Sequence, residues 1–229
     1  MGLLTVSVVA ALAAVAFMLV VPATKVRPAP VPMLRGVLAN LKNPGVLVSV
    51  CQAFLLMGAF VSAYNYLTFR LQQAPFYLSL AEVSLIFLAY LAGAVASKQV
   101  WKLAPRLTPT GALLASIGVM LVGVALTLLP SLIAVVGGLI LLTGGFFGAH
   151  TIASTLGPRR SQVAQSMVPP LYNLGFYSGS SLLGWVGGLA FAAAGWPGTV
   201  GFIAVMGLFA ATLAYGYALR NGGLRAVDG

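Results

Sequence analysis

The sequence predicts an all-α integral membrane protein with seven transmembrane helices. Of its 229 residues, 60% are hydrophobic and only 6% are charged, a balance that excludes a soluble domain with a charged surface. A bilayer core of about 30 Å requires roughly 20 apolar residues per helix, so the chain has room for about seven spans with short loops. The long apolar runs also lack the period-two alternation that is typical of a transmembrane β-barrel.

Seven apolar runs define the predicted spans. They cover residues 3–22, 45–68, 80–97, 108–129, 131–153, 168–194 and 197–219. The prolines fall between these runs or at their ends, where a missing backbone N–H costs little. We divide the chain into a first span (1–24), a cytoplasmic linker (25–44), a six-helix bundle (45–220) and a cytoplasmic tail (221–229).

The distribution of Lys and Arg predicts the orientation of the chain. Basic residues concentrate in the cytoplasmic loops of membrane proteins. Eleven of the 12 basic residues lie in one set of alternating loops, and only Arg70 lies in the other set. This asymmetry predicts an outside N-terminus and a cytoplasmic C-terminus. The net charge of +10 therefore indicates a lipid bilayer as the partner and no nucleic acid.

The first span and the linker differ from the rest of the chain. The first span has no charge before Lys25, whereas a signal peptide has a basic stretch before its apolar core. We therefore expect other spans to precede this one in a longer protein. In the linker, apolar residues recur at helical spacing from Met33 to Leu41, which indicates a short amphipathic helix on the cytoplasmic leaflet or, alternatively, an irregular basic loop.

A weak internal repeat joins the second and fifth spans. Residues 55–64 and 141–150 agree at five of ten positions. The two spans are three apart in the order of the chain. The copies therefore run in opposite directions through the membrane, as inverted-topology repeats do. We predict a bundle of two inverted three-helix repeats. Chance agreement in a sequence rich in Leu, Gly and Ala is the alternative.

The pattern of six spans behind a basic, amphipathic linker resembles the C-terminal half of a major facilitator superfamily transporter. Local stretches are similar to the YnfM-like group of bacterial efflux transporters, namely Leu56–Val61, Tyr64–Tyr66, Leu85–Leu88, Thr143–His150 and Gly179–Trp185. The resemblance implies that residues 1–24 correspond to the sixth of twelve helices. It also implies a secondary transporter of a small molecule in the bacterial inner membrane, working as an efflux system that is coupled to protons as an antiporter.

The same resemblance leaves a second interpretation open. One six-helix bundle supplies only one wall of a transport cavity. The chain is therefore expected either to transport with a second bundle or to be a truncated half-transporter without autonomous transport. Its partner in that case is a separate N-terminal half or a second copy of this chain.

Polar residues on the second and fifth spans are the candidates for the substrate path, because the resemblance makes these spans cavity-lining. The candidates are Gln52, Tyr64, Asn65, Thr143, His150 and Thr151. Each of them is equally compatible with an interhelical hydrogen bond worth about 1 kcal/mol or less. His150 is also a candidate for proton coupling because histidine titrates near neutral pH, although an ordinary interfacial histidine is the alternative.

Glu82 is the second candidate for proton coupling, since it is the only carboxylate near a span. The stretch Ser79–Glu82 is also a capping-box pattern at the start of the third span, and Arg70 lies across the same short loop as an ion partner. Capping or ion pairing is thus the alternative role for this residue.

Glycines recur at one-turn spacing in the fifth and sixth spans, where small residues let helix backbones approach closely. We predict helix packing at Gly144, Gly148, Gly175, Gly179, Gly184 and Gly188. The chain lacks the serine protease motif, the paired aspartates and the His or carboxylate cluster that a membrane enzyme would use. We accordingly expect no enzymatic activity, metal or cofactor.

Overall fold

The computed structural model describes residues 2–20, 32–103 and 107–221, with side chains for 6–20, 32–99 and 107–221. Parts of the predicted linker, with Lys25 and Arg27, and of the predicted tail, with Arg225, lie outside these ranges. So does Arg106, in the predicted six-helix bundle. The chain divides into two units, Met1–Val31 and Pro32–Gly229, which are described separately. The first unit contains one helix, α1 (Gly2–Val20), whose described side chains are exposed.

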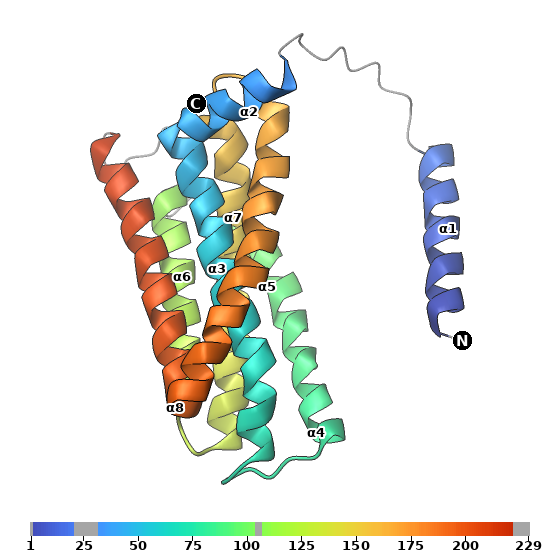
Figure 1. The fold of residues 1–229 in the computed structure, drawn as a ribbon, viewed down its shortest axis with the longest axis vertical. Coiled ribbons are helices and arrows are strands. Elements are labelled where there is room, and N and C mark those ends of the chain that lie inside the picture. Colours follow the sequence, from blue (N-terminus) through green and yellow to red (C-terminus); the bar gives the residue numbers. More distant parts are fainter. Residues whose placement is uncertain (1, 21–31, 104–106, 222–229) are drawn as a thin grey trace. The chain divides into compact units, whose positions relative to one another are not determined.

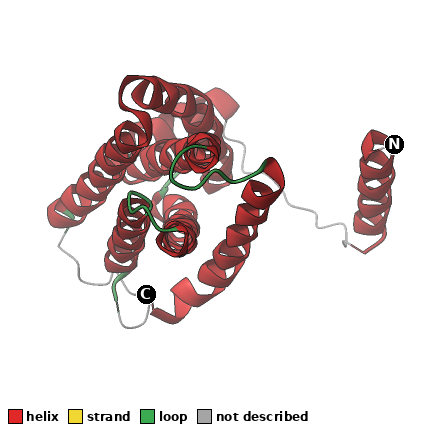
Figure 2. Cartoon of the chain, turned by 90° about the horizontal axis from the view of Figure 1, so that it is seen from below, coloured by secondary structure: helices red, strands yellow, loops and turns green. Residues whose placement is uncertain are grey.

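The second unit is a bundle of helices with short connections (Figures 1 and 2). Its elements are α2 (Met33–Lys42), α3 (Pro44–Gln72), α4 (Leu80–Leu85), the 3-10 helix η1 (Ile86–Ala89), α5 (Tyr90–Leu103), α6 (Pro109–Leu126), α7 (Leu132–Arg160), the 3-10 helix η2 (Gln165–Met167) and α8 (Val168–Arg220). The described residues are helical apart from these connections, which confirms the all-α class.

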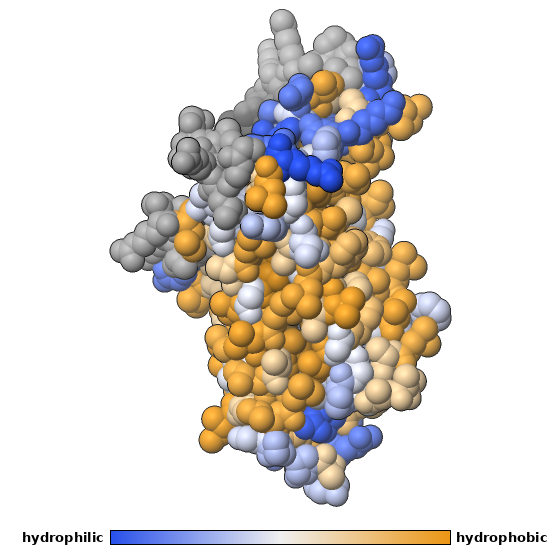
Figure 3. Space-filling view, turned by 90° about the vertical axis from the view of Figure 1, so that its left-hand side faces the viewer, coloured by the Kyte–Doolittle hydropathy of each residue, from blue (hydrophilic) through white to orange (hydrophobic). Residues whose placement is uncertain are grey.

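Five helices among the described residues are long and apolar enough to cross a membrane. Together, α4, η1 and α5 make one of these five. The second unit carries hydrophilic residues at its two ends and an apolar band between them (Figure 3). These findings confirm an integral membrane protein. The count of seven spans and the two inverted repeats stay predictions.

The longest helix, α8, contains two of the predicted spans. Ala194 (φ −143°, ψ 19°) and Gly195 (φ 61°, ψ −149°) interrupt its helical geometry. The conformation of Gly195 is one that only glycine adopts readily. The two segments, 168–193 and 196–220, meet at this break and diverge from it toward the end of the bundle that carries α2 (Figure 1). Trp196 links the second segment to the end of α6. Its indole N–H donates to the carbonyl and hydroxyl oxygens of Thr127, the residue that follows α6, at 3.2 and 3.0 Å.

Side chains in the loops set where the helices begin. The Asn43 side chain accepts hydrogen bonds from the first backbone amides of α3, with Pro44 at the first helical position. Thr108 caps α6 in the same way, again before a proline. Ser79 and Glu82 form the complete capping box of α4, so that sequence pattern is confirmed. These caps satisfy amide groups that would otherwise lack partners at the helix ends.

Helix α3 packs most extensively on α8, and α6 on α7. Gly175 and Gly179 lie against the backbone of α3. A Cβ added at Gly175 would lie 2.8 Å from the Val50 carbonyl oxygen, and one added at Gly179 would overlap the Phe54 carbonyl oxygen. The other predicted packing glycines have varied surroundings. An added Cβ would make an ordinary contact with Ala96 at Gly144 and a tight contact of 3.2 Å with Val61 at Gly184. At Gly188 it would overlap the Tyr66 side chain, and Gly148 is buried.

Candidate functional site

Aromatic side chains from four α-helices and the 3-10 helix η1 form one continuous cluster in the bundle. We call it the aromatic cluster; its members are Phe60 and Tyr64 from α3, Phe87 from η1, Tyr90 from α5, Phe146, Phe147 and His150 from α7, and Tyr172 and Phe176 from α8. At its centre, the rings of Phe60 and Phe146 stack with centroids 4.1 Å apart and planes 15° apart. This stack joins α3 and α7, the two most buried of the spanning helices.

A buried hydrogen bond lies on one side of this stack. The hydroxyl oxygens of Tyr64 and Thr143 are 2.7 Å apart, and both side chains are buried. The Tyr64 ring also packs on Phe60 and Tyr90, with centroid distances of 4.9 and 4.8 Å. Two candidate residues from the second and fifth predicted spans are therefore in direct contact.

His150 lies at the other side of the stack. Its Nδ1 is 3.0 Å from the Tyr172 hydroxyl, so the tautomer of the ring decides which of the two atoms donates. The His150 ring stacks on Phe146 at 5.9 Å and contacts Phe176 at 5.1 Å. The histidine is half-buried, with one nitrogen paired and the ring held between aromatic faces. This environment can orient an imidazole that exchanges a proton or hydrogen-bonds a ligand.

The remaining candidates for the substrate path lie elsewhere. Gln52 is 1% exposed, and its amide nitrogen donates to the Ala210 carbonyl of α8 at 2.7 Å. Its Oε1 is buried and has no partner among the described residues. Asn65 is exposed, and Thr151 donates to the Phe147 carbonyl one turn back on its own helix. The structure thus brings together Tyr64, Thr143 and His150 of the six candidates.

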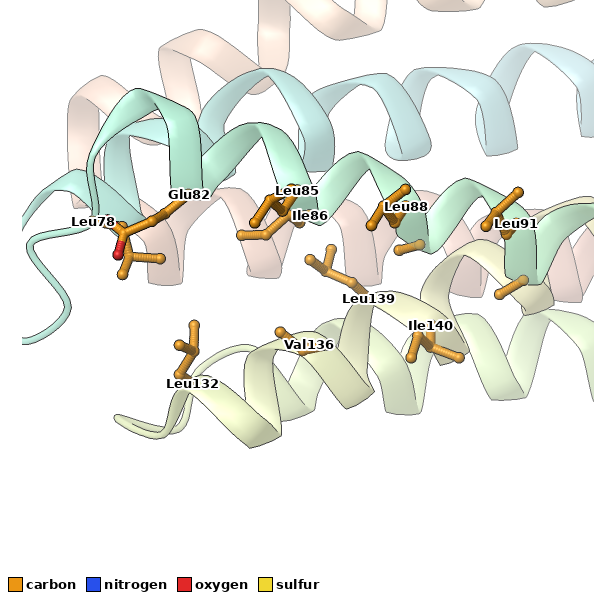
Figure 4. A pocket seen from close by; sticks show the side chains of 12 residues that line it. Leu78, Glu82, Leu85, Ile86, Leu88, Leu91, Leu132, Val136, Leu139 and Ile140 are labelled. Atoms are coloured by element: carbon orange, nitrogen blue, oxygen red, sulfur yellow. The ribbon is translucent and has the colours of Figure 1, made fainter.

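Glu82 lies at the end of an apolar groove between α4, η1 and α5 on one side and α7 on the other (Figure 4). The groove has a volume of about 600 Å³. It is lined by Leu85, Leu88 and Leu91 on one side and by Val136 and Ile140 on the other. Both the amide and the hydroxyl of Ser79 donate to Glu82 Oε2 at 2.8 Å. Within the described part of the chain, Arg70 contacts the Leu128 carbonyl and the Phe76 ring rather than this carboxylate.

The chain is similar to several curated membrane transporters. It is 48% identical over 166 residues to the inner membrane transport protein YnfM of Escherichia coli K12, an alignment that covers 72% of this chain and 40% of that protein. It is 36% identical over 182 residues to the uncharacterized transporter BU588 of Buchnera aphidicola from Acyrthosiphon pisum, with 80% and 44% covered. It is 30% identical over 168 residues to the uncharacterized MFS-type transporter YybF of Bacillus subtilis, with 73% and 41% covered.

The chain is a relative of the YnfM-like transporters of the major facilitator superfamily. The resemblance stated from the sequence is therefore confirmed. The chain spans about half the length of the curated relatives that it matches, which fits one half of a YnfM-like protein. No family model matches the chain, and no solved structure matches it.

Sequence reasoning missed several members of the aromatic cluster, above all Phe60, Tyr90 and Tyr172, and interpreted Phe146, Phe147 and Phe176 as core or lipid-facing residues. A usable signal was present. Aromatic or histidine pairs recur three or four residues apart on each of the contributing segments, at 60 and 64, 87 and 90, 146 and 150, and 172 and 176. Residues at this spacing lie on one face of a helix. The same face recurring on four segments indicates a shared aromatic surface.

Proposed function

We propose that the chain is one six-helix half of a major-facilitator-type secondary transporter that moves a small amphipathic molecule out across the inner membrane. The names of its relatives support transport as the general activity, and the name of the E. coli relative supports the inner membrane. Efflux and proton coupling are our inference from the family resemblance.

The single observation that carries the proposal is the aromatic cluster. Ligand sites of this kind are mostly apolar with a few well-placed polar groups. The cluster has this composition, since its polar groups are the hydroxyls of Tyr64, Tyr90 and Tyr172 and the imidazole of His150, and Tyr64 is paired with Thr143 outside the cluster. At its edge, Tyr90 and Phe87 are 40% and 49% exposed, so their rings are open to a ligand. An apolar ring system with hydrogen-bonding groups is the chemistry that this surface binds best.

The polar pairs also suggest how protons could be coupled to transport. His150 is our first candidate for the coupling residue, because it is held by one hydrogen bond next to the rings that a ligand would contact. Glu82 is the second, and its exposure at the end of the apolar groove would let it exchange protons with water. Its place in the capping box gives it a structural role as well.

The partial coverage of the relatives favours a second candidate, a half-transporter that works only with a partner. The surfaces of η1, of α5 and of the first segment of α8 support it. Leu88, Leu91, Tyr177 and Trp185 are all more than 60% exposed on them. Exposed apolar side chains of this size fit lipid or a second helical bundle. The partner would be an N-terminal half or a second copy of this chain.

A dye-export assay tests transport itself and separates the two kinds of partner. The host is a bacterium without its own YnfM-like transporters, and the probes are ethidium, a cation, and Nile red, a neutral amphipathic dye. Cells express the chain alone, the N-terminal half of E. coli YnfM alone, or both. Export only with both supports the paired half, and export with the chain alone supports a homodimer. Dye retention at the level of empty cells in all three arms would count against transport of amphipathic molecules.

A further inference from the structure

A second cavity lies at the end of the bundle that carries α2, the opposite end from the apolar groove beside Glu82. We call it the basic pocket. It has a volume of about 410 Å³, and its polar lining residues are Asn40, Lys42, Asn43, Arg160, Gln162, Tyr217 and Asn221. They come from the end of α2, the start of α3, the end of α7 and the end of α8. Four helix ends therefore meet around one polar cavity.

Arg160 is held in this pocket by two contacts. Its guanidinium lies over the Tyr217 ring with its carbon 4.5 Å from the ring centroid. Its carbonyl oxygen accepts a hydrogen bond from the Asn43 side chain at 2.9 Å. Because the Tyr217 ring covers only the face of the guanidinium, the N–H groups at its edges can still donate hydrogen bonds. These edges match the geometry of a phosphate.

The pocket has no carboxylate to balance its charge within the described residues. The whole chain has two acidic residues, Glu82 and Asp228. Glu82 follows the far end of α3, and the 29 residues of that helix correspond to about 40 Å. Asp228 lies outside the described residues. Two cations and four side-chain amides therefore line a cavity without a described counter-ion, which favours an anionic ligand.

An apolar groove adjoins the basic pocket. Leu34 and Leu38 line it together with Arg35, and it has a volume of about 510 Å³. Ala39 and Lys42 line both cavities, so the two are neighbours along α2. Asn40 fixes α2 in place, because its side chain donates to the Val163 carbonyl at 3.0 Å and accepts from the Ser161 hydroxyl at 2.6 Å. The walls of both cavities are thus held by buried polar contacts.

From this arrangement we infer that the basic pocket and its neighbouring groove bind an anionic phospholipid. The phosphate lies between Lys42 and Arg160, and one acyl chain follows Leu34 and Leu38 along α2. A free phosphate would use the basic pocket but not the groove. The lipid would hold the ends of α2, α3, α7 and α8 together at the membrane surface.

Native mass spectrometry of the full chain tests this inference, with dioleoyl phosphatidylglycerol as the anionic probe and dioleoyl phosphatidylcholine as the zwitterionic one. The wild type is expected to retain phosphatidylglycerol at least tenfold more strongly. Arg160→Gln is expected to weaken its binding about tenfold, since a charge-assisted hydrogen bond is lost. Arg70→Gln, which removes an arginine at the opposite end, is the matched control and should bind as the wild type does. Equal losses for the two variants would overturn the proposal.

Further variants keep the test decisive if Arg160→Gln folds poorly. Lys42 is exposed, so Lys42→Gln should fold, and it too should weaken phosphatidylglycerol binding. Leu38→Ser should weaken the lipid but not inorganic phosphate. Displacement of the lipid by millimolar phosphate in every variant would assign the pocket to a free anion. If lipid bound only to the Asp228→Asn variant, the occupant of the basic pocket in the wild type would be the chain's own carboxyl-terminal tail. Either of these results would overturn the lipid assignment.

Discussion

Replacement of Gly179 by alanine should destabilise the chain by opening the α3–α8 contact. An added Cβ would overlap the Phe54 carbonyl oxygen and lie 2.7 Å from both the carbonyl carbon and the Cα of that residue. Ordinary contact begins near 3.4 Å, so these backbone atoms would have to move apart by at least about 0.7 Å. The neighbouring atoms are backbone and cannot rotate away as a side chain could.

The expected cost follows from the rigidity of this contact. Overpacking of a well-packed site costs typically about 1–3 kcal/mol. Gly201→Ala is the matched control, because it lies on the same helix and an added Cβ there meets nothing within 4 Å. Substitutions away from packed sites usually change stability by less than about 0.5 kcal/mol. The two variants should therefore differ by about 1–3 kcal/mol in the free energy of unfolding.

The sole cysteine provides the assay. Cys51 is half-buried on α3, between the two residues that contact Gly175 and Gly179. Chains in mild detergent are titrated with sodium dodecyl sulfate, and the reaction of Cys51 with a thiol-reactive fluorophore reports exposure of α3. Gly179→Ala should reach its midpoint at a lower denaturant fraction than Gly201→Ala. Coincident midpoints would refute the close α3–α8 packing on which the bundle depends.

Three further predictions concern other parts of the bundle. A double-mutant cycle with Tyr64→Phe and Thr143→Val should give a coupling of about 0.6 kcal/mol in the same unfolding assay, and additive effects would contradict their hydrogen bond. Trp196→Phe should destabilise the chain by about 1–3 kcal/mol, because it leaves the buried Thr127 oxygens without their donor, whereas Trp196→Phe combined with Thr127→Val should recover part of this loss. Alkaline phosphatase fused after Gln73 should be active and the same enzyme fused at the carboxyl end inactive, and the reverse pattern would contradict the positive-inside orientation.

The membrane class and the approximate helix positions could be predicted from the sequence because lipid imposes one dominant requirement. A spanning helix must be apolar over most of its length, and composition records this directly. Helix starts were also readable, as the capping box at Ser79 and Glu82 shows, because a cap needs only neighbouring residues.

The contacts between helices could not be predicted in the same way. In a membrane protein the packed face and the lipid-facing face are both apolar, so hydropathy does not select the interface. The glycine pattern thus drew attention to Gly144, whereas a close approach to α6 occurs at Gly145, next to the Met120 amide and the Ser116 carbonyl. Gln52 is a second case, since its partner Ala210 is 158 residues away and its polarity alone suggested a substrate contact.

The most direct test of the proposed substrate path is the dye-export rate of two tyrosine variants, each coexpressed with the N-terminal half of E. coli YnfM. Tyr90 belongs to the aromatic cluster and is 40% exposed, whereas Tyr215 lies outside it on α8 and is 46% exposed. Removal of an aromatic contact worth about 1 kcal/mol should lower export about fivefold in Tyr90→Ala, with Tyr215→Ala unchanged at equal protein levels. Equal export by the two variants would contradict the assignment of the aromatic cluster to the substrate path.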